Sequence, residues 1–157
     1  MKKYLYLLSV LFVLPLLLFT SCLEKEETEV PTALLKKWNL KVIAYTDKAD
    51  LLPPQGAKVW IEFAKKQTSP GYSFNGVASP NIYFGDITLS NEGTNGTMLV
   101  GDMAATEIGS TKMLSSEFEI EYFNLLRLAT SYSIQQNTLI LHCPDGEKLI
   151  YTSGVND

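Results

Sequence analysis

Alternation of apolar and polar residues runs through most of this chain from Trp38 onward, and it limits the chain to a β-rich fold. The first run places Trp38, Leu40 and Val42 on one side, with Asn39 and Lys41 between them. Because successive side chains of a strand point to opposite faces, this period of two predicts half-buried strands. Similar runs predict further strands at residues 59–63, 72–74, 81–89, 97–100 with an extension through 103–107, 132–134, 138–143 and 147–152.

Turn residues separate these runs. Pro53-Pro54-Gln55-Gly56 breaks the chain after the first strand. A hairpin loop is predicted at residues 91–96, because its Asn95-Gly96 pair suits positions with positive φ. Gln136-Asn137 and Pro144-Asp145-Gly146 predict turns between the last three strands. The chain has no internal repeat, and 157 residues is an ordinary length for one domain.

One segment changes to a helical period, at residues 117–128. Its apolar positions recur every three or four residues, at Phe118, Tyr122, Leu125, Leu126 and Ala129. Ser116 and Glu119 predict a capping box at its start, and Arg127 lies near its end, where the helix dipole favours a positive charge. The expected fold is therefore mainly β, a small antiparallel barrel-like structure with one amphipathic α-helix.

The first 22 residues have the pattern of an export signal. Lys2 and Lys3 precede an uncharged apolar run from Tyr4 to Phe19, which ends shortly before Cys22. This segment resembles the lipobox of bacterial lipoproteins, in which the cysteine is diacylated and the chain is cut just before it. An uncleaved signal anchor is the alternative. The predicted organisation is a lipoprotein signal peptide at 1–21, an acidic tether at 22–33 and a folded domain at 34–157.

The residues after Cys22 indicate in which membrane the lipoprotein is expected. Residue 23 is Leu rather than Asp, so the inner-membrane retention signal known from enterobacterial lipoproteins is absent. The acid-rich stretch that follows resembles the surface-export signal of Bacteroidetes lipoproteins, and it suits a simple soluble spacer equally well. We expect an outer membrane lipoprotein held in the membrane by its lipid anchor, in either the periplasmic or the surface-exposed leaflet.

Composition argues against several kinds of site. The chain holds 13 Lys and Arg against 17 Asp and Glu, and this acidity argues against nucleic acid. One His and two Cys exclude most multi-ligand zinc sites, so we expect no metal. With Cys22 acylated, Cys143 is the remaining thiol, and alternation places it with Leu139 and Leu141 as a small buried hydrophobe rather than a reactive group.

No residue pattern predicts catalysis. His142 adjoins Cys143, but consecutive strand residues point to opposite faces. Four strand carboxylates could converge in space, although no spacing singles one out: Glu62, Asp86, Asp102 and Glu107. We therefore expect no enzyme activity, and no cofactor besides the covalent lipid on Cys22.

Several motifs in order resemble one known family, the META domain family, also called HslJ-like or DUF306. The matching features, quoted in chain order, are Trp38-x-Leu40, Asn81-x-Tyr83-x-Gly85, Ser110-Thr111-Lys112-Met113, the amphipathic helix, Tyr132-x-Ile134, Leu139-x-Leu141 and Asp145-Gly146. The resemblance covers the whole predicted domain. It implies a small, mainly-β barrel-like fold with one helix, in bacterial envelope lipoproteins linked to heat shock, motility or secretion, and it implies no catalytic residue.

This sequence departs from the family at two places. Many members carry a cysteine directly before the Asn and another two residues past the Met, where this chain has Pro80 and Ser115. The cross-link implied by those cysteines is therefore absent here. The motif residues Trp38, Asn81, Tyr83, Gly85, Thr111 and Met113 are expected to fix the fold rather than bind a ligand. Asn81 is expected to bond the backbone of a neighbouring loop, and Gly85 to mark a bulge or a close approach.

A candidate binding surface lies on the other face of the strands. Trp60 alternates with buried positions, as does Phe84, so both are predicted to lie on the outer face of a barrel. Exposed, they could anchor a protein partner or stack on a sugar; alternatively, the helix covers this face and Trp60 packs under it. Two functions stay open. One is a non-enzymatic envelope lipoprotein with a protein-interaction or stress- or secretion-related role, and the other is a surface-exposed module for a small molecule, glycan or lipid.

Overall fold

The computed structural model describes residues 33–67, 71–90, 94–108 and 113–154. Eight strands and one helix fall within these ranges. The strands are β1 (Lys37–Ala44), β2 (Val59–Lys65), β3 (Tyr72–Ala78), β4 (Asn81–Ser90), β5 (Asn95–Ala105), β6 (Ser131–Gln135), β7 (Thr138–His142) and β8 (Lys148–Thr152), and the helix is α2 (Met113–Leu128). The predicted mainly-β fold with one helix is confirmed.

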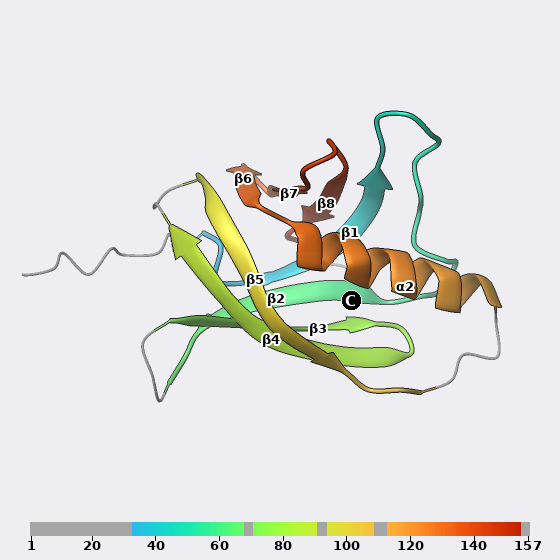
Figure 1. Ribbon diagram of the computed structural model, residues 1–157, viewed down its shortest axis with the longest axis horizontal. Helices are drawn as coiled ribbons and strands as arrows, with labels where there is room; N and C mark the ends of the chain where they lie inside the picture. The colour runs from blue at the N-terminus through green and yellow to red at the C-terminus, as the bar shows by residue number, and fades with distance from the viewer. Residues whose placement is uncertain (1–32, 68–70, 91–93, 109–112, 155–157) are drawn as a thin grey trace, which may run out of the picture.

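The strands form a closed antiparallel barrel (Figure 1). Each strand pairs with the next one along the chain, and β1 pairs with β8 to complete the ring. The predicted alternation is clear in β4, where Asn81 and Tyr83 are buried and Ile82 and Phe84 are exposed. A strand with one face inside and one face outside is what a barrel of this size requires.

The helix covers an open side of this barrel. β5 pairs with β6 through three residue pairs, from Asn95–Ser133 to Thr97–Ser131, and the rest of β5 pairs with β4 alone. α2 lies across the open side, between the strands β2 to β4 and the strands β6 to β8 (Figure 1). The apolar stripe predicted for the helix is buried in the core, from Phe118 at 5% exposure to Ala129 at 3%.

The position of the helix overturns one expectation. The sequence left open that α2 covers the outer face of the sheet and shields Trp60. Instead, the helix packs on residues that point into the barrel, with Tyr122 against Tyr83 and Phe123 also touching Tyr83. The reason is that the β5–β6 gap exposes the apolar interior, and covering that interior removes more apolar surface from water. The outer face is left uncovered by α2.

Two local predictions were also wrong. The helix begins at Met113, so Ser116 lies within its first turns and does not cap it. The Asn95-Gly96 pair does not form a turn; it opens β5 and pairs with Ser133 and Tyr132. In both cases a local signal was overridden by pairing or packing available only in the folded chain. In the described residues, no helix is long and apolar enough to span a membrane.

Candidate functional site

The family motif residues form the inside of the barrel. Trp38 is fully buried, and its indole Nε1 donates to the Leu34 carbonyl over 3.0 Å. This bond ties the segment before β1 to the core and satisfies the buried indole N–H. Cys22 and Thr111 lie outside the described residues. Met113 is the first residue of α2, and its side chain lies outside them too.

Asn81 holds the segment that follows β5. Its Oδ1 accepts from the Ile108 backbone N–H over 2.7 Å and from the Thr106 hydroxyl over 3.0 Å, and its Nδ2 donates to the Ile108 carbonyl over 3.4 Å. The residue is 6% exposed, so its amide needs such partners. The expected bond between Asn81 and a neighbouring loop is confirmed, and this residue has a structural role.

Gly85 lies both at a β-bulge and at a close approach of other segments, the two features predicted for it. The β4–β5 register shifts between Gly85 and Ile87, as in a β-bulge. A Cβ at Gly85 would also lie 2.6 Å from the Asp102 carbonyl oxygen and 2.6 Å from a ring carbon of Phe74. The glycine therefore allows β5 and the Phe74 ring to approach β4 closely.

Three tyrosines form a chain of hydroxyl groups in the core. Tyr83 donates to the Trp60 carbonyl over 2.9 Å, and its oxygen lies 2.6 Å from the Tyr122 hydroxyl. Tyr122 in turn lies 3.1 Å from the Tyr151 hydroxyl. Because each hydroxyl carries one proton, Tyr151 donates to Tyr122 and Tyr122 donates to Tyr83. The chain links β4, α2 and β8 and satisfies polar atoms that water does not reach.

Burial keeps these hydroxyls protonated. It raises the pKa of Tyr122 to about 12 and raises the pKa values of Tyr83 and Tyr151 well above 10. The pKa of tyrosine in an unfolded chain is about 10, so above that pH the unfolded chain releases protons that the folded chain keeps. The stability linked to these groups is therefore complete below about pH 10 and is lost as the pH rises toward the folded pKa values.

We predict that the three core tyrosines do not ionise before the protein unfolds. In an alkaline titration followed by tyrosinate absorbance, exposed tyrosines should titrate smoothly, and the remainder should ionise together with the loss of the near-ultraviolet circular dichroism signal. A Tyr151→Phe variant should reduce the late step by one tyrosine. Smooth ionisation of every tyrosine with tertiary structure intact would contradict the buried hydroxyl chain.

A carboxylate near Asn81 was missed by sequence reasoning. Burial raises the pKa of Glu119, and a hydrogen bond from Asn81 offsets part of that effect. Its Oε1 is buried, without a hydrogen-bond partner among the described residues. The sequence suggested only a capping role at the helix start for Glu119, because the proximity of Glu119 to Asn81 depends on how α2 packs against the barrel.

Cys143 and His142 take the positions expected of them. Cys143 is buried, and its Sγ donates to the Leu125 carbonyl over 3.3 Å. Burial, followed by the nearby carboxylates of Glu147 and Asp145, raises the pKa of this thiol to about 11. His142 lies on the opposite face at 3.0 Å from the Ser133 hydroxyl, and its pKa is lowered by burial and by Lys148.

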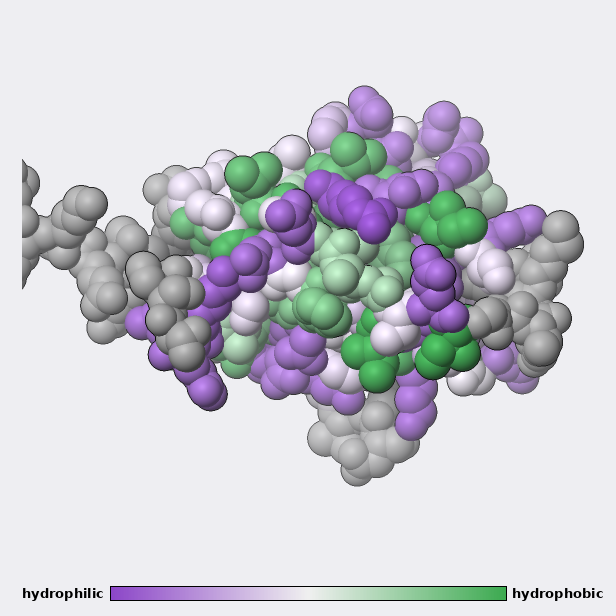
Figure 2. Space-filling model, turned by 60° about the horizontal axis from the view of Figure 1, so that its bottom comes forward, coloured by the Kyte–Doolittle hydropathy of each residue, from purple (hydrophilic) through white to green (hydrophobic). Residues whose placement is uncertain are grey.

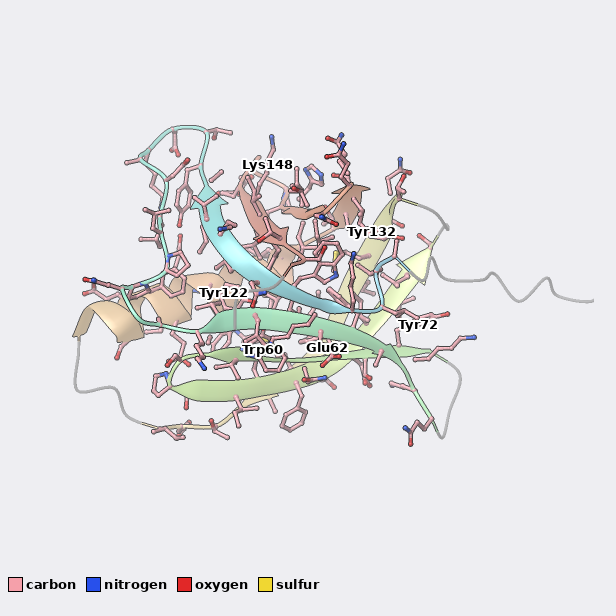
Figure 3. The ribbon with its side chains drawn as sticks, turned by 180° about the vertical axis from the view of Figure 1, so that it is seen from behind. Trp60, Glu62, Tyr72, Tyr122, Tyr132 and Lys148 are labelled. Carbon is pink, nitrogen blue, oxygen red and sulfur yellow. The ribbon has the colours of Figure 1, made fainter. Side chains whose placement is uncertain are left out.

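The outer face of β2, β3 and β4 carries exposed apolar groups. Ile82 is 53% exposed and Phe84 is 56% exposed, and Trp60 and Val77 are partly exposed beside them. Register aligns Trp60 with Val77 and Val77 with Ile82 across three strands. Figure 3 shows Trp60 and Tyr122 on opposite sides of β2. The structure therefore brings both predicted surface residues, Trp60 and Phe84, to one face.

A groove of about 450 Å³ lies over β3, β4 and β5 beside this apolar face. Its lining includes Asn75, Phe84, Asp86, Asp102 and Ala104. Of the four carboxylates that could have converged, the groove brings together Asp86 and Asp102, which the pairing of β4 with β5 places near each other. In the described segments, no group of three or more His, Cys, Asp or Glu side chains is placed to hold a metal ion.

Comparison with family models identifies a family for this chain, and comparison with solved structures identifies its fold. A family model described as META domain matches residues 32–155. The NMR structure of a protein from Burkholderia xenovorans is similar at a TM-score of 0.64 and 20% identity, over 80% of this chain and 87% of that chain. A second NMR structure is similar at a TM-score of 0.50 and 19% identity, over 76% of this chain and 89% of that chain. Likeness at these identities shows the fold alone. No curated protein matches the chain.

Proposed function

Because the chain belongs to the META domain family, we propose that it is a non-enzymatic binding protein of the bacterial cell envelope that recognises another protein. The observation that carries this proposal is the contrast between its two sheet faces. The inner face is packed with aromatic and aliphatic side chains, whereas the outer face presents Trp60, Ile82 and Phe84 to solvent. A grouped, exposed apolar face is typical of a protein contact.

The same proposal includes an anchor. Cys22 follows a short apolar signal and precedes an acidic segment, which supports a diacylated lipoprotein of the outer membrane. The tether from Cys22 to the first described residue, Ala33, would hold the domain near the bilayer. The outer face would then meet partners that share the membrane surface, where two-dimensional confinement raises the effective concentration.

A second candidate function is the binding of a small molecule, glycan or lipid. It is supported by the groove over β3 to β5, whose volume of about 450 Å³ falls in the usual range for ligand sites. The groove is open to solvent and is not an enclosed cavity inside the barrel. Protein binding is favoured because the exposed apolar residues extend beyond the groove to Trp60.

In-cell crosslinking followed by affinity capture of the full-length chain tests the proposal. We expect an envelope protein to be captured by the parent chain and lost in a Cys22→Ser variant. A Trp60→Ala/Phe84→Ala variant should lose capture while its melting temperature stays nearly unchanged, because Phe84 is exposed and Trp60 lies outside the core.

Leu52→Ala is the matched control, since Leu52 is 66% exposed outside this face. Unchanged capture by the Trp60→Ala/Phe84→Ala variant would reject the outer face as the binding surface. A large fall in that variant's melting temperature would instead assign Trp60 to the core.

A further inference from the structure

β5 has one edge that is mostly unpaired. Along its other edge it pairs with β4, whereas its pairing with β6 covers only its first three residues. Met98 then donates its N–H to the Thr130 carbonyl over 2.8 Å. From Leu99 to Ala105, no other strand of the described residues lies beside this edge, which we call the free edge of β5. Figure 1 shows β5 running away from β6 toward the C-terminal end of the strand.

One hydrogen bond shows where the backbone groups of this strand point. The Thr106 N–H donates to the Ile82 carbonyl over 2.9 Å, so the backbone groups of Thr106 face β4. Because these groups alternate in direction along an antiparallel strand, those of Ala105 and Met103 face away from β4, at the free edge. An extended polypeptide beside β5 could form hydrogen bonds with them.

The free edge is open to solvent. Asp102, Ala104 and Ala105 are exposed. Ala105 pairs with Tyr83, whose side chain is fully buried inside the barrel, so the two side chains point to the same side of the sheet. Since Ala105 is exposed on that inner side, α2 does not cover the barrel opening at this end of β5. Figure 2, turned so that the lower side of Figure 1 comes forward, shows a hydrophobic area in the middle of the molecule with hydrophilic residues around it.

The end of β5 is fixed by the family motif residue Asn81. Its Oδ1 accepts from the Thr106 hydroxyl and from the Ile108 N–H, and the Thr106 hydroxyl oxygen in turn accepts from the Ile82 N–H over 3.1 Å. These bonds hold the strand extended up to its last residues. A strand edge that is already ordered loses less conformational entropy when a partner binds.

The free edge is also acidic. Between residues 94 and 108 the chain has two carboxylates, Asp102 and Glu107, and no lysine or arginine. Both carboxylates are exposed, and no ion pair joins either of them to another described residue. Opposite charges on neighbouring strands stabilise their pairing, and like charges oppose it. The edge therefore fits a strand with basic side chains, whereas a second copy of this chain would bring the same two carboxylates.

From this geometry and charge we propose that the free edge of β5 binds an extended basic segment of a partner polypeptide, which adds to the sheet as a further strand. Main-chain hydrogen bonds to Met103 and Ala105 hold the segment, and a basic side chain beside Asp102 selects it. The free edge is a different surface from the outer face that carries Trp60 and Phe84. The inference therefore goes beyond the proposed function and does not rest on it.

Binding of a defined peptide to the full-length chain in mild detergent tests the free edge. The probe is a fluorescent peptide of about eight residues in which valine and lysine alternate, long enough to span the edge. We expect fluorescence anisotropy to show binding, and hydrogen exchange to slow in residues 99–105. A peptide with glutamate in place of lysine should bind roughly tenfold more weakly or worse. A peptide with every backbone amide N-methylated should not bind, because it cannot donate to the edge.

Variants of the chain place the peptide on the edge. Ala105→Pro removes an N–H at the free edge and keeps the bonds to β4, and proline is tolerated on strand edges. It should weaken binding roughly tenfold or more, with a nearly unchanged melting temperature. Asp102→Lys should weaken binding as well, whereas Asp145→Lys, at an exposed position outside the edge, should not. Trp60→Ala/Phe84→Ala should bind the peptide as the parent does.

Four results would overturn the inference. The first two are no binding of the valine–lysine peptide to the folded chain, and equal binding of the N-methylated peptide. The third is unchanged affinity in Asp102→Lys, which decides the matter even if Ala105→Pro lowers the melting temperature. The fourth is protection of residues 99–105 that grows with protein concentration without peptide, which would identify a second copy as the occupant.

Failure of the free edge is distinguishable from failure of the proposed function. Loss of peptide binding in Trp60→Ala/Phe84→Ala, with Ala105→Pro unaffected, would place the peptide on the outer face. That result would reject the edge and leave the proposed binding surface intact. Conversely, unchanged envelope-protein capture by Trp60→Ala/Phe84→Ala would reject the outer face without affecting the peptide result at β5.

Discussion

Gly76→Ala is expected to lower the free energy of unfolding by roughly 3 kcal/mol or more, among the largest losses for a single methyl group in this chain. Gly76 is buried in β3, between Ile61 on β2 and Tyr83 on β4. A Cβ there would overlap the Trp60 carbonyl oxygen and the hydroxyl end of Tyr83. These are the two groups that share the last hydrogen bond of the tyrosine chain. Alanine would therefore force the strands apart and break that bond.

Thermal unfolding followed by circular dichroism measures the effect, and we expect a drop of about 10 °C or more in melting temperature. Gly101→Ala is the matched control, because a Cβ at Gly101 would meet the Asp86 carbonyl at 3.3 Å and no buried side chain. The control should change the melting temperature by only a few degrees. Equal changes of melting temperature in the two variants would show that the strands around Gly76 can move apart at little cost in stability.

Tyr122→Ala is expected to destabilise the protein by about 3–5 kcal/mol and to release the helix. Tyr122 is fully buried and stacks with Phe118 at a ring-centroid distance of 6.3 Å. It also contacts Tyr83 and Phe123 and lies in the middle of the hydroxyl chain. Truncation would leave a cavity where α2 meets the barrel, with the hydroxyls of Tyr83 and Tyr151 no longer joined.

Hydrogen exchange separates this effect from a general loss of stability. Amides of α2 should lose protection in Tyr122→Ala more than those of β2 and β3. Tyr122→Phe should cost about 1–2 kcal/mol, because it removes the hydroxyl and keeps the ring. Ile120→Ala, at a position 62% exposed on the same helix, should change stability by about 0.5 kcal/mol or less. A helix that stays protected in Tyr122→Ala would contradict its role as the anchor.

Much of this fold could be predicted from the sequence, because the alternation of apolar and polar residues within each strand indicates which side chains are buried. In β4, the period of two separates Asn81 and Tyr83 from Ile82 and Phe84, and the structure has the same division. The helix face from Phe118 to Ala129 was equally clear. The roles of Asn81 and Gly85 could be predicted as well. A buried side-chain amide needs hydrogen-bond partners, and a glycine within a strand indicates that another segment approaches the backbone closely.

The parts that could not be predicted depend on relations between elements. An apolar helix face fits the outside of a sheet as well as the mouth of a barrel, so nothing in residues 113–128 alone decides between them. The hydroxyl chain requires Tyr83, Tyr122 and Tyr151 to meet from three elements, which register and helix docking determine. The groove carboxylates Asp86 and Asp102 come together because β4 and β5 pair in the register that sets Gly85 opposite Met103, one residue away from each.

The first and last strands of the barrel close it, and this closure affects the order in which the strands can fold. β1 pairs with β8, so Asn39 contacts Thr152 across nearly the whole length of the domain. Contacts between residues so far apart in the sequence form slowly, because closing the long intervening loop costs conformational entropy before the contact itself stabilises the chain. The barrel cannot close on a nascent chain whose last strand is still in the ribosome. Closure of the barrel therefore waits for β8, however early the hairpins of the other strands form.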